Sequence, residues 1–269
     1  MVTLAGAMST AEIGRSLAPA IRSGKVSAIC CTGANLEEDL FNLVAHSHYG
    51  TIEDWRSLSP VEESQLENRI TNRTLPEKEA IRKVESQLVS LWKSSDGRLP
   101  HEFLYELIQR IEYDADPADS WLLAAAECNL PLFVPGWEDS TLGNIFAARV
   151  MDGTVSIDAV LSGTHYMLAL ADWIRGHPKN GFLQVGGGIA GDFPICVVPL
   201  LRQDLGEDVP LWAWFAQISE SSPSYGGYSG APPNEKISWQ KLGVDTPKFV
   251  IESDASIVLP ILLTCLCEA

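Results

Sequence analysis

The segment NEKISWQKLG, residues 234–243, holds a candidate for covalent chemistry in Lys241, which follows Trp239 by two positions and Glu235 by six. A lysine amine attacks an electrophilic carbon only after it loses its proton, and burial against an apolar wall promotes that loss. Trp239 would supply such a wall, and Glu235 would bind an ammonium substrate. An ordinary solvated lysine is the alternative, and the residue types alone do not decide between the two.

Small and acidic residues follow several apolar runs and are candidate nucleotide contacts. The segments are 32–35 (TGAN), 136–140 (GWEDS), 186–188 (GGG) and 252–255 (ESDA). Three glycines between a strand and a helix let the backbone approach a pyrophosphate, although a plain tight turn explains them equally well. A carboxylate of Glu37-Glu38-Asp39 would reach ribose hydroxyls, or these acids simply suit the first turn of a helix. Asp254 is first an N-cap and second a nucleotide contact.

Strands must alternate with helices to place these segments together. Apolar runs predict strands at 2–6, 26–31, 131–136, 182–188, 209–218 and 248–253. Amphipathic patterns predict helices between them, at 77–93, 101–112, 118–128 and 157–175 among others, and a buried final helix at 254–266. This order predicts an α/β fold, a doubly wound, mostly parallel sheet with helices on both faces. Residues 46–130 form a largely helical insertion.

Composition narrows the class of protein further. The 269 residues carry a net charge of −16, so we expect no nucleic-acid partner. The six cysteines form no C-x-x-C pair, which favours reduced thiols in a cytoplasmic protein over disulfides or a metal site. The N-terminus lacks the pattern of a secretion signal, and the apolar C-terminal run is too short to span a bilayer, so we expect no membrane association.

Six segments, in order and spacing, resemble the deoxyhypusine synthase family and its bacterial homologues over nearly the whole chain. They are TGANLEEDL (32–40), NRITN (68–72) with Leu75-Pro76, EDSTLGN (138–144), VGGG (185–188), SGAPPNEKISWQKL (229–242) and DASIVLPILL (254–263). The resemblance implies a Rossmann-like fold in one NAD-binding domain, residues 1–269, with 46–130 as the helical insertion. It also implies a homotetramer whose active sites lie at dimer interfaces.

The resemblance implies an NAD-dependent aminoalkyl (aminobutyl) transferase that acts on a polyamine or diamine. In the family, spermidine is oxidised with NAD⁺, its butylamine fragment forms an imine on the motif lysine, and an acceptor amine then receives the fragment. The acceptor is a protein lysine in deoxyhypusine synthase and putrescine in the related homospermidine synthases. The motif lysine corresponds to Lys241, with Trp239 and Glu235 beside it in the substrate site. The NAD contacts would be Thr32, Gly33, Glu38, Asp139, Gly187, Gly188, Ser229, Asp254 and Ala255.

Four positions depart from the family pattern. Asn144 stands for an aspartate, Asp192 falls where the family has its active-site histidine, and Tyr225 and Tyr228 replace aspartates of a substrate loop. Asp192 would then serve as the base, and Asn144, Tyr225 and Tyr228 would contact substrate. A pocket so altered suits a non-standard donor or acceptor amine. An NAD-dependent amine oxidoreductase without transfer and a catalytically silent NAD-binding homologue are the alternatives.

Overall fold

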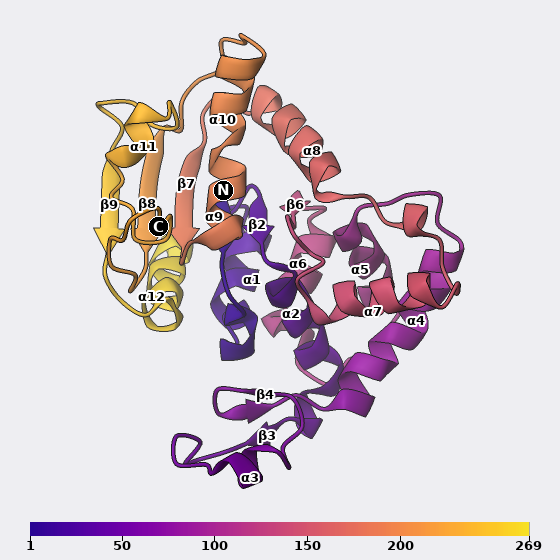
Figure 1. Ribbon diagram of the computed structural model, residues 1–269. Helices are drawn as coiled ribbons and strands as arrows, with labels where there is room; N and C mark the ends of the chain where they lie inside the picture. Colours follow the sequence, from indigo (N-terminus) through magenta and orange to yellow (C-terminus); the bar gives the residue numbers. More distant parts are fainter. Residues whose placement is uncertain (269) are drawn as a thin grey trace.

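Six parallel strands form the central sheet of the computed structural model, which describes residues 1–268 (Figure 1). Their order is β6-β2-β1-β7-β8-β9. The strands are β1 (Val2–Leu4), β2 (Ile29–Cys31), β6 (Leu132–Phe133), β7 (Gly181–Val185), β8 (Trp214–Ile218) and β9 (Lys248–Ile251). Five of them lie within predicted apolar runs, and β7 begins one residue before its run, at Gly181. The predicted α/β fold with a mostly parallel sheet is confirmed.

Helices surround this sheet, as the alternating sequence pattern predicts. Near the termini and the last crossovers they are α1 (Gly14–Arg22), α2 (Gly33–Ala45), α7 (Thr141–Met151), α8 (Gly163–Gly176), α9 (Gly188–Ile195), α10 (Val197–Pro199), α11 (Glu235–Ser238) and α12 (Ala255–Glu268). Helix α1 packs against α6 (Trp121–Glu127) and α12, whereas α10 packs against α8 and α9. Strands β1, β2 and β6 are buried throughout, which is the arrangement that continuous hydrophobic strands require, whereas Phe249 and Val250 of edge strand β9 are exposed.

The chain adds β2 and β6 on one side of β1, and then β7, β8 and β9 on the other side, so the order of strands changes direction between β1 and β7. The amide of Ala5 donates to the carbonyl of Val185 over 3.1 Å, and a Cβ built on Gly186 would lie 2.8 Å from the Ala5 Cβ. The triple-glycine turn thus crosses the end of β1 at close range. Ligands of open parallel sheets bind at such a switch point, outside the carboxyl ends of the strands.

The segment predicted as a helical insertion contains helices and also a small sheet. The helices are α3 (Pro60–Glu63), a π-helical turn at Glu77–Arg82, α4 (Lys83–Lys93), α5 (Pro100–Ile108) and α6. Strands β3 (Gly50–Thr51), β5 (Arg73–Thr74) and β4 (Arg69–Ile70) form an antiparallel sheet that sequence patterning missed. Two-residue strands carry no periodicity. This sheet projects away from the main body at the lower edge of Figure 1.

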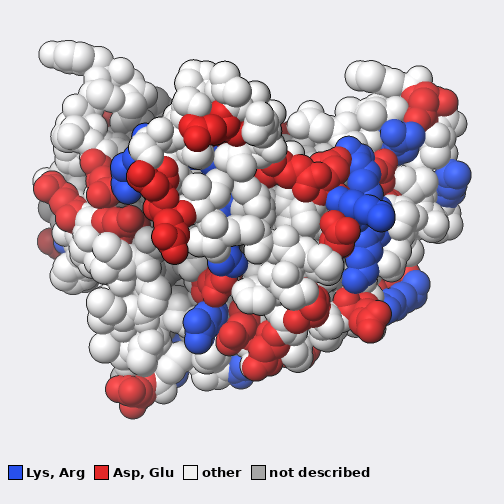
Figure 2. Space-filling model, turned by 90° about the horizontal axis from the view of Figure 1, so that it is seen from below, with Lys and Arg blue, Asp and Glu red and all other residues white. Residues whose placement is uncertain are grey.

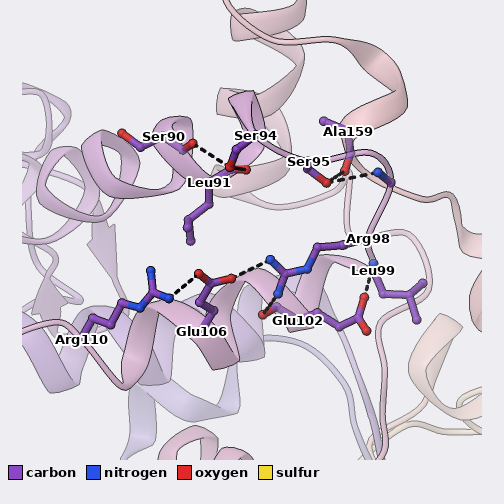
Figure 3. A network of polar contacts seen from close by, with 11 residues as sticks. Ser90, Leu91, Ser94, Ser95, Arg98, Leu99, Glu102, Glu106, Arg110 and Ala159 are labelled. Carbon is purple, nitrogen blue, oxygen red and sulfur yellow. Dashed lines mark hydrogen bonds and ion pairs between the residues drawn. The ribbon is translucent and has the colours of Figure 1, made fainter.

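A polar network joins α4, α5 and the segment before α8 (Figure 3). Glu106 accepts from Arg98 at 2.6 Å and pairs with Arg110 at 2.7 Å. Arg98 also donates to the carbonyl of Glu102, whose carboxylate accepts from the amide of Leu99 and so satisfies the start of α5. These bonds fix the α4–α5 connection.

The final helix is not buried as the sequence predicts. Only Leu259 and Leu263 of α12 are buried, whereas Ile257, Ile261 and Leu262 are exposed. Hydrophobicity alone suggested a core helix, but this helix packs on α1 along one stripe and leaves the rest of its apolar surface open. An open apolar surface of this kind is typical of a protein interface.

Charged side chains of both signs are interspersed on the face shown in Figure 2. Basic side chains gather mainly along one side of that face and alternate there with acidic ones. Within residues 1–268, no helix combines the length and the apolar character that crossing a membrane requires.

Candidate functional site

Lys241 lies in a tight turn that directs its side chain inward. Its amide donates to the carbonyl of Lys236, and its carbonyl accepts from the amide of Trp212, which ties the turn to the strand side of the fold. Gln240 takes a left-handed conformation with φ of 55°, which bends the chain before Lys241. The Lys241 side chain is only 8% exposed. The interpretation as a solvated surface lysine is therefore wrong.

Asp192 faces Lys241. The Lys241 Nζ donates to the Asp192 Oδ1 over 2.9 Å, and the Asp192 side chain is 47% exposed. Asp192 lies in α9, the helix that begins at Gly188 in the triple-glycine turn. The Cys196 Sγ contacts the same carboxylate oxygen at 3.4 Å, and burial raises the pKa of the Cys196 thiol. One short helix thus connects the lysine to the predicted nucleotide loop.

The aromatic wall beside Lys241 is Tyr228 rather than Trp239. Trp239 is 61% exposed and its ring centre lies 6.0 Å from the Lys241 Nζ. The Tyr228 ring centre lies at 5.5 Å, and the Tyr228 hydroxyl donates to the Oε1 of buried Gln184 over 2.6 Å. Trp239 was expected to exclude water from Lys241. The chain turns at Gln240, however, and the Trp239 ring faces solvent. Tyr228, predicted to contact substrate, takes that place.

The triple-glycine turn is packed against Ser229. The amide of Gly188 donates to the Ser229 Oγ over 3.0 Å, and a Cβ on Gly187 would come within 2.3 Å of that oxygen and 2.6 Å of the Ser229 Cα. Gly186 and Gly188 have φ of +77° and +56°. Gln217 of β8 holds the other side of Ser229 by donating to its carbonyl over 2.6 Å. The close approach to Ser229 leaves no room for a side chain at Gly187, and the positive φ of Gly186 and Gly188 favours glycine at those two positions.

Three acidic residues of α2 have two different roles. Glu37 and Asp39 cap other helices, whereas one carboxylate oxygen of Glu38 has no hydrogen-bond partner among residues 1–268. Glu37 accepts from the amides of Thr141 and Leu142 at 2.8 and 2.7 Å, and so caps α7. Asp39 accepts in the same way at the start of α6. Glu38 is buried, and its Oε2 has no hydrogen-bond partner within residues 1–268. Burial, and then the charge of Glu37, raise the pKa of Glu38 to about 7.

The loop after β2 is built around Thr32 and Asn35. The Thr32 hydroxyl accepts from the Asn35 amide as the N-cap of α2 and donates to the carbonyl of Gly6. Ser9 is buried and bonded to Asn35, and the helix that follows it, α1, begins at Gly14. A Cβ on Gly33 would come within 2.7 Å of the Ser140 Cβ. Thr32 and Gly33 therefore lie against the loop after β6.

The other predicted site residues are placed at the same sheet edge or in solvent. Asp139 follows β6 and is exposed, and Asp254 accepts from the amide of Ser256 and so caps the helix that begins at Ala255. Glu235 begins α11 and is exposed. Asn144 and Tyr225 are exposed, and within residues 1–268 neither side chain makes a hydrogen bond to Lys241 or Asp192.

Sequence reasoning missed Lys236. This residue is 3% exposed and its Nζ has no hydrogen-bond partner among residues 1–268. Burial, followed by the charge of Lys241, lowers the pKa of Lys236 to about 8. A lysine five positions before the candidate nucleophile was the available signal, but lysine is so rarely buried that its type suggested a solvated side chain.

Two observations favour binding of a dinucleotide at the carboxyl ends of the strands. Gly187 and Gly188 form a glycine cradle in which a side chain at Gly187 would collide with Ser229, whereas a Cβ on Gly188 would meet no atom within 4 Å and so leaves open space at the start of α9. Glu38 offers a buried carboxylate oxygen without a hydrogen-bond partner among residues 1–268. The glycines would approach a pyrophosphate, and Glu38 would accept from ribose hydroxyls. Asp192, on the same helix as the cradle, would then place Lys241 beside the reacting end of the dinucleotide.

Comparisons with known proteins show the family of this chain. The family model for deoxyhypusine synthase matches residues 1–266. The chain is 30% identical to a deoxyhypusine synthase-like protein of Thermosynechococcus vestitus, over 97% of this chain and 68% of that protein. A similarly named protein of a Nostoc species is 29% identical, over 97% and 70% of the two chains.

Among solved structures, a proposed deoxyhypusine synthase of Entamoeba histolytica has a similar fold. Its TM-score is 0.59 at 15% identity, with 98% of this chain and 72% of that chain covered. At such low identity the likeness concerns the fold alone. The match of the family model over almost the full length is what decides the relationship: the chain belongs to the deoxyhypusine synthase family.

Proposed function

We propose that this protein is an NAD-dependent aminoalkyl transferase in which Lys241 carries the alkyl fragment as an imine. The observation that carries the proposal is the buried Lys241 amine, bonded to Asp192 on the helix that begins in the triple-glycine turn. This contact supports a single site made of the lysine and the loop that we expect to bind the nucleotide. We also propose that the whole chain acts as one NAD-binding domain.

The residues divide the chemistry between them. Gly187, Gly188 and Glu38 would hold NAD⁺, which would supply the acceptor for a hydride from the carbon beside the donor nitrogen and the source of the hydride that the final imine needs. The Lys241 amine adds to the oxidised carbon and the original amine leaves. Asp192 takes a proton from the Lys241 Nζ and returns one to the leaving amine. An acceptor amine then displaces Lys241, so that one C–N bond replaces another and the lysine is restored.

The substrate is a small amine, with a donor or acceptor outside the usual pair of the family. Asp192 is the one acidic side chain that contacts Lys241 within residues 1–268, and the aromatic ring of Tyr228 stands where an aspartate would add charge. A ring attracts a cation less strongly than a carboxylate does. A diamine or a shorter polyamine therefore suits this pocket, and homospermidine-type transfer to putrescine is the first reaction to examine.

Assembly into a homotetramer with sites at dimer interfaces is part of the proposal. The exposed apolar residues of α12, together with Phe249 and Val250 on edge strand β9, offer a surface for another copy of the chain. Asp192 and Trp239 are open to solvent on one side, which leaves room for residues of a neighbouring subunit.

Trapping tests the proposed chemistry directly. The protein is incubated with NAD⁺ and a panel of diamines and polyamines, treated with borohydride, and digested for mass spectrometry. We expect an aminoalkyl adduct on Lys241 and a transferred product without net formation of NADH. Net release of NADH without an adduct would instead support an amine oxidoreductase, and neither signal with any amine would contradict both activities.

Replacement of Gly187 by alanine is expected to weaken NAD⁺ binding by about tenfold or more. The new Cβ would displace Ser229, whose hydroxyl accepts from the amide of Gly188, and so would distort the glycine turn. Titration of protein fluorescence with NAD⁺ measures the change. Gly176→Ala is the control, because nothing lies within 4 Å of its new Cβ. Equal affinities of the two variants would place the nucleotide elsewhere.

A further inference from the structure

Lys236 is a buried cation beside Lys241, and no acidic side chain of residues 1–268 bonds to it. The residue is 3% exposed, and its Nζ has no hydrogen-bond partner in that part of the chain. The Asp192 carboxylate bonds to Lys241 instead, and Glu235 is exposed. Burial of an unpaired ammonium group lowers the stability of a fold, whereas an apolar side chain would pack without that loss. The cost suggests that the charge has a use.

Two aromatic rings take the place of the missing anion. The Lys236 Nζ lies 4.8 Å from the centre of the Tyr228 ring and 4.9 Å from that of the Phe215 ring. The Tyr228 ring is held by its hydroxyl, which donates to the Gln184 Oε1 over 2.6 Å. The Phe215 ring stacks on that of Phe182, with 5.8 Å between the ring centres. Aromatic faces attract ammonium groups, so the two rings form a cation site whose walls do not depend on Lys236.

This cation site adjoins the candidate nucleophile. The Lys241 Nζ lies 5.5 Å from the centre of the same Tyr228 ring. The carbonyl of Lys236 accepts from the amide of Lys241 over 3.1 Å, which fixes the two residues in one turn. Burial lowers the pKa of Lys236 only to about 8, so its amine is mostly charged at pH 7. An amine substrate at Lys241 therefore meets a wall that already holds a positive charge.

We propose that Lys236 determines substrate specificity: its side chain occupies the aromatic cation site of Phe215 and Tyr228, so that the pocket favours diamines over triamines such as spermidine. The inference rests on the proposed function and deepens it, because it names the class of amine that reaches Lys241. A further ammonium group on the substrate would have to displace Lys236 or bind beside its charge, which water screens poorly in a buried site. A diamine has one ammonium group fewer and so avoids this repulsion.

A guest that replaces the lysine side chain tests the cation site without NAD⁺ or turnover. Lys236→Ala removes the aliphatic chain and the amine, which n-propylammonium matches in size and charge. We expect n-propylammonium to raise the melting temperature of this variant by about 3 °C more than an equal concentration of 1-propanol, its neutral counterpart. The unsubstituted protein should show no such difference, and adding Tyr228→Leu to the alanine variant should abolish it. Equal effects of the two compounds on the folded alanine variant would overturn the proposal.

Titration calorimetry with putrescine and spermidine in the presence of NAD⁺ tests the specificity. The unsubstituted protein is expected to bind putrescine at least about tenfold more tightly than spermidine, and Lys236→Ala to reduce that ratio by about tenfold. Lys236→Arg keeps a cation in the site and should keep the preference. An unchanged ratio in the alanine variant, or a preference of the unsubstituted protein for spermidine, would reject the role in specificity. Lys236→Ser has the same expectations if the alanine variant does not fold.

The proposed function fails or holds separately from this inference. The n-propylammonium effect and the preference for putrescine, without any adduct on Lys241 after borohydride treatment, would support the role of Lys236 and reject aminoalkyl transfer. Adducts on Lys241 from putrescine and spermidine alike, without an n-propylammonium effect in the alanine variant, would do the reverse.

Discussion

Lys241→Ala is expected to reduce aminoalkyl transfer by at least about 10³-fold, because it removes the atom that bonds to the alkyl fragment. Binding of NAD⁺ should change little, since the glycine cradle and Glu38 belong to other elements. Transfer is measured as product formed from a donor and an acceptor amine, and NAD⁺ binding by fluorescence titration. The expected result is thus a loss of turnover with the cofactor site intact.

Two variants decide what the lysine contributes. Lys241→Arg keeps a positive charge near Asp192 but has no nucleophilic amine at neutral pH, so it should be as inactive as the alanine variant. Lys179→Ala removes an exposed lysine and should leave the rate unchanged. Substantial transfer by the arginine variant would show that Lys241 acts through its charge. If both Lys241 variants still released NADH from an amine, oxidation without transfer would be the better account.

The main sheet and its binding edge were predictable because buried parallel strands leave a strong pattern. The runs that became β1, β2, β7 and β8 are apolar and bounded by glycines or polar turns. Three of these strands lie within their predicted ranges, and β7 begins one residue earlier, at Gly181. Once the strands were known, the loops after them had to meet at one edge. The short sheet of β3, β4 and β5 could not be predicted, since its strands have two residues each.

Side-chain environments were harder to predict than elements. The sequence suggested Trp239 as the wall beside Lys241, but the left-handed turn at Gln240 exposes that ring and brings in Tyr228 from a separate loop. Burial of Lys236 depends on the same tertiary packing. Such contacts join residues far apart in the chain, and neither residue type nor local periodicity contains them.

The three acids of α2 show the same limit. From residue type alone, Glu37, Glu38 and Asp39 could not be told apart: each was either an acid of a first helical turn or a ribose contact. In the structure two of them cap other helices, α7 and α6, and only Glu38 keeps a free carboxylate oxygen among the described residues. The local spacing of residues does not predict a helix cap that comes from a distant element. Removal of such a cap nevertheless has a measurable effect on stability.

Asp39→Ala is expected to destabilise the protein by about 2–4 kcal/mol at pH 7. The buried Asp39 carboxylate accepts from the Ser120 hydroxyl at 2.5 Å and from the amides of Leu122 and Trp121 at 3.0 and 3.4 Å. Alanine leaves these donors unpaired at the start of α6 and opens a cavity. The melting temperature should fall by about 5–12 °C, as measured by calorimetry. Glu112→Ala, at an exposed acid, should change it little.

The pH dependence gives this prediction a second test. Burial outweighs the hydrogen bonds and raises the pKa of Asp39 from 3.8 to about 6. Between these values the folded protein keeps a proton that the unfolded chain releases, so this residue makes stability fall as the pH rises from about 4 to 6. The loss approaches about 3 kcal/mol above pH 6. Asp39→Asn cannot titrate and should flatten that part of the profile. An unchanged slope in the asparagine variant would mean that Asp39 is charged throughout the range and that water reaches its carboxylate.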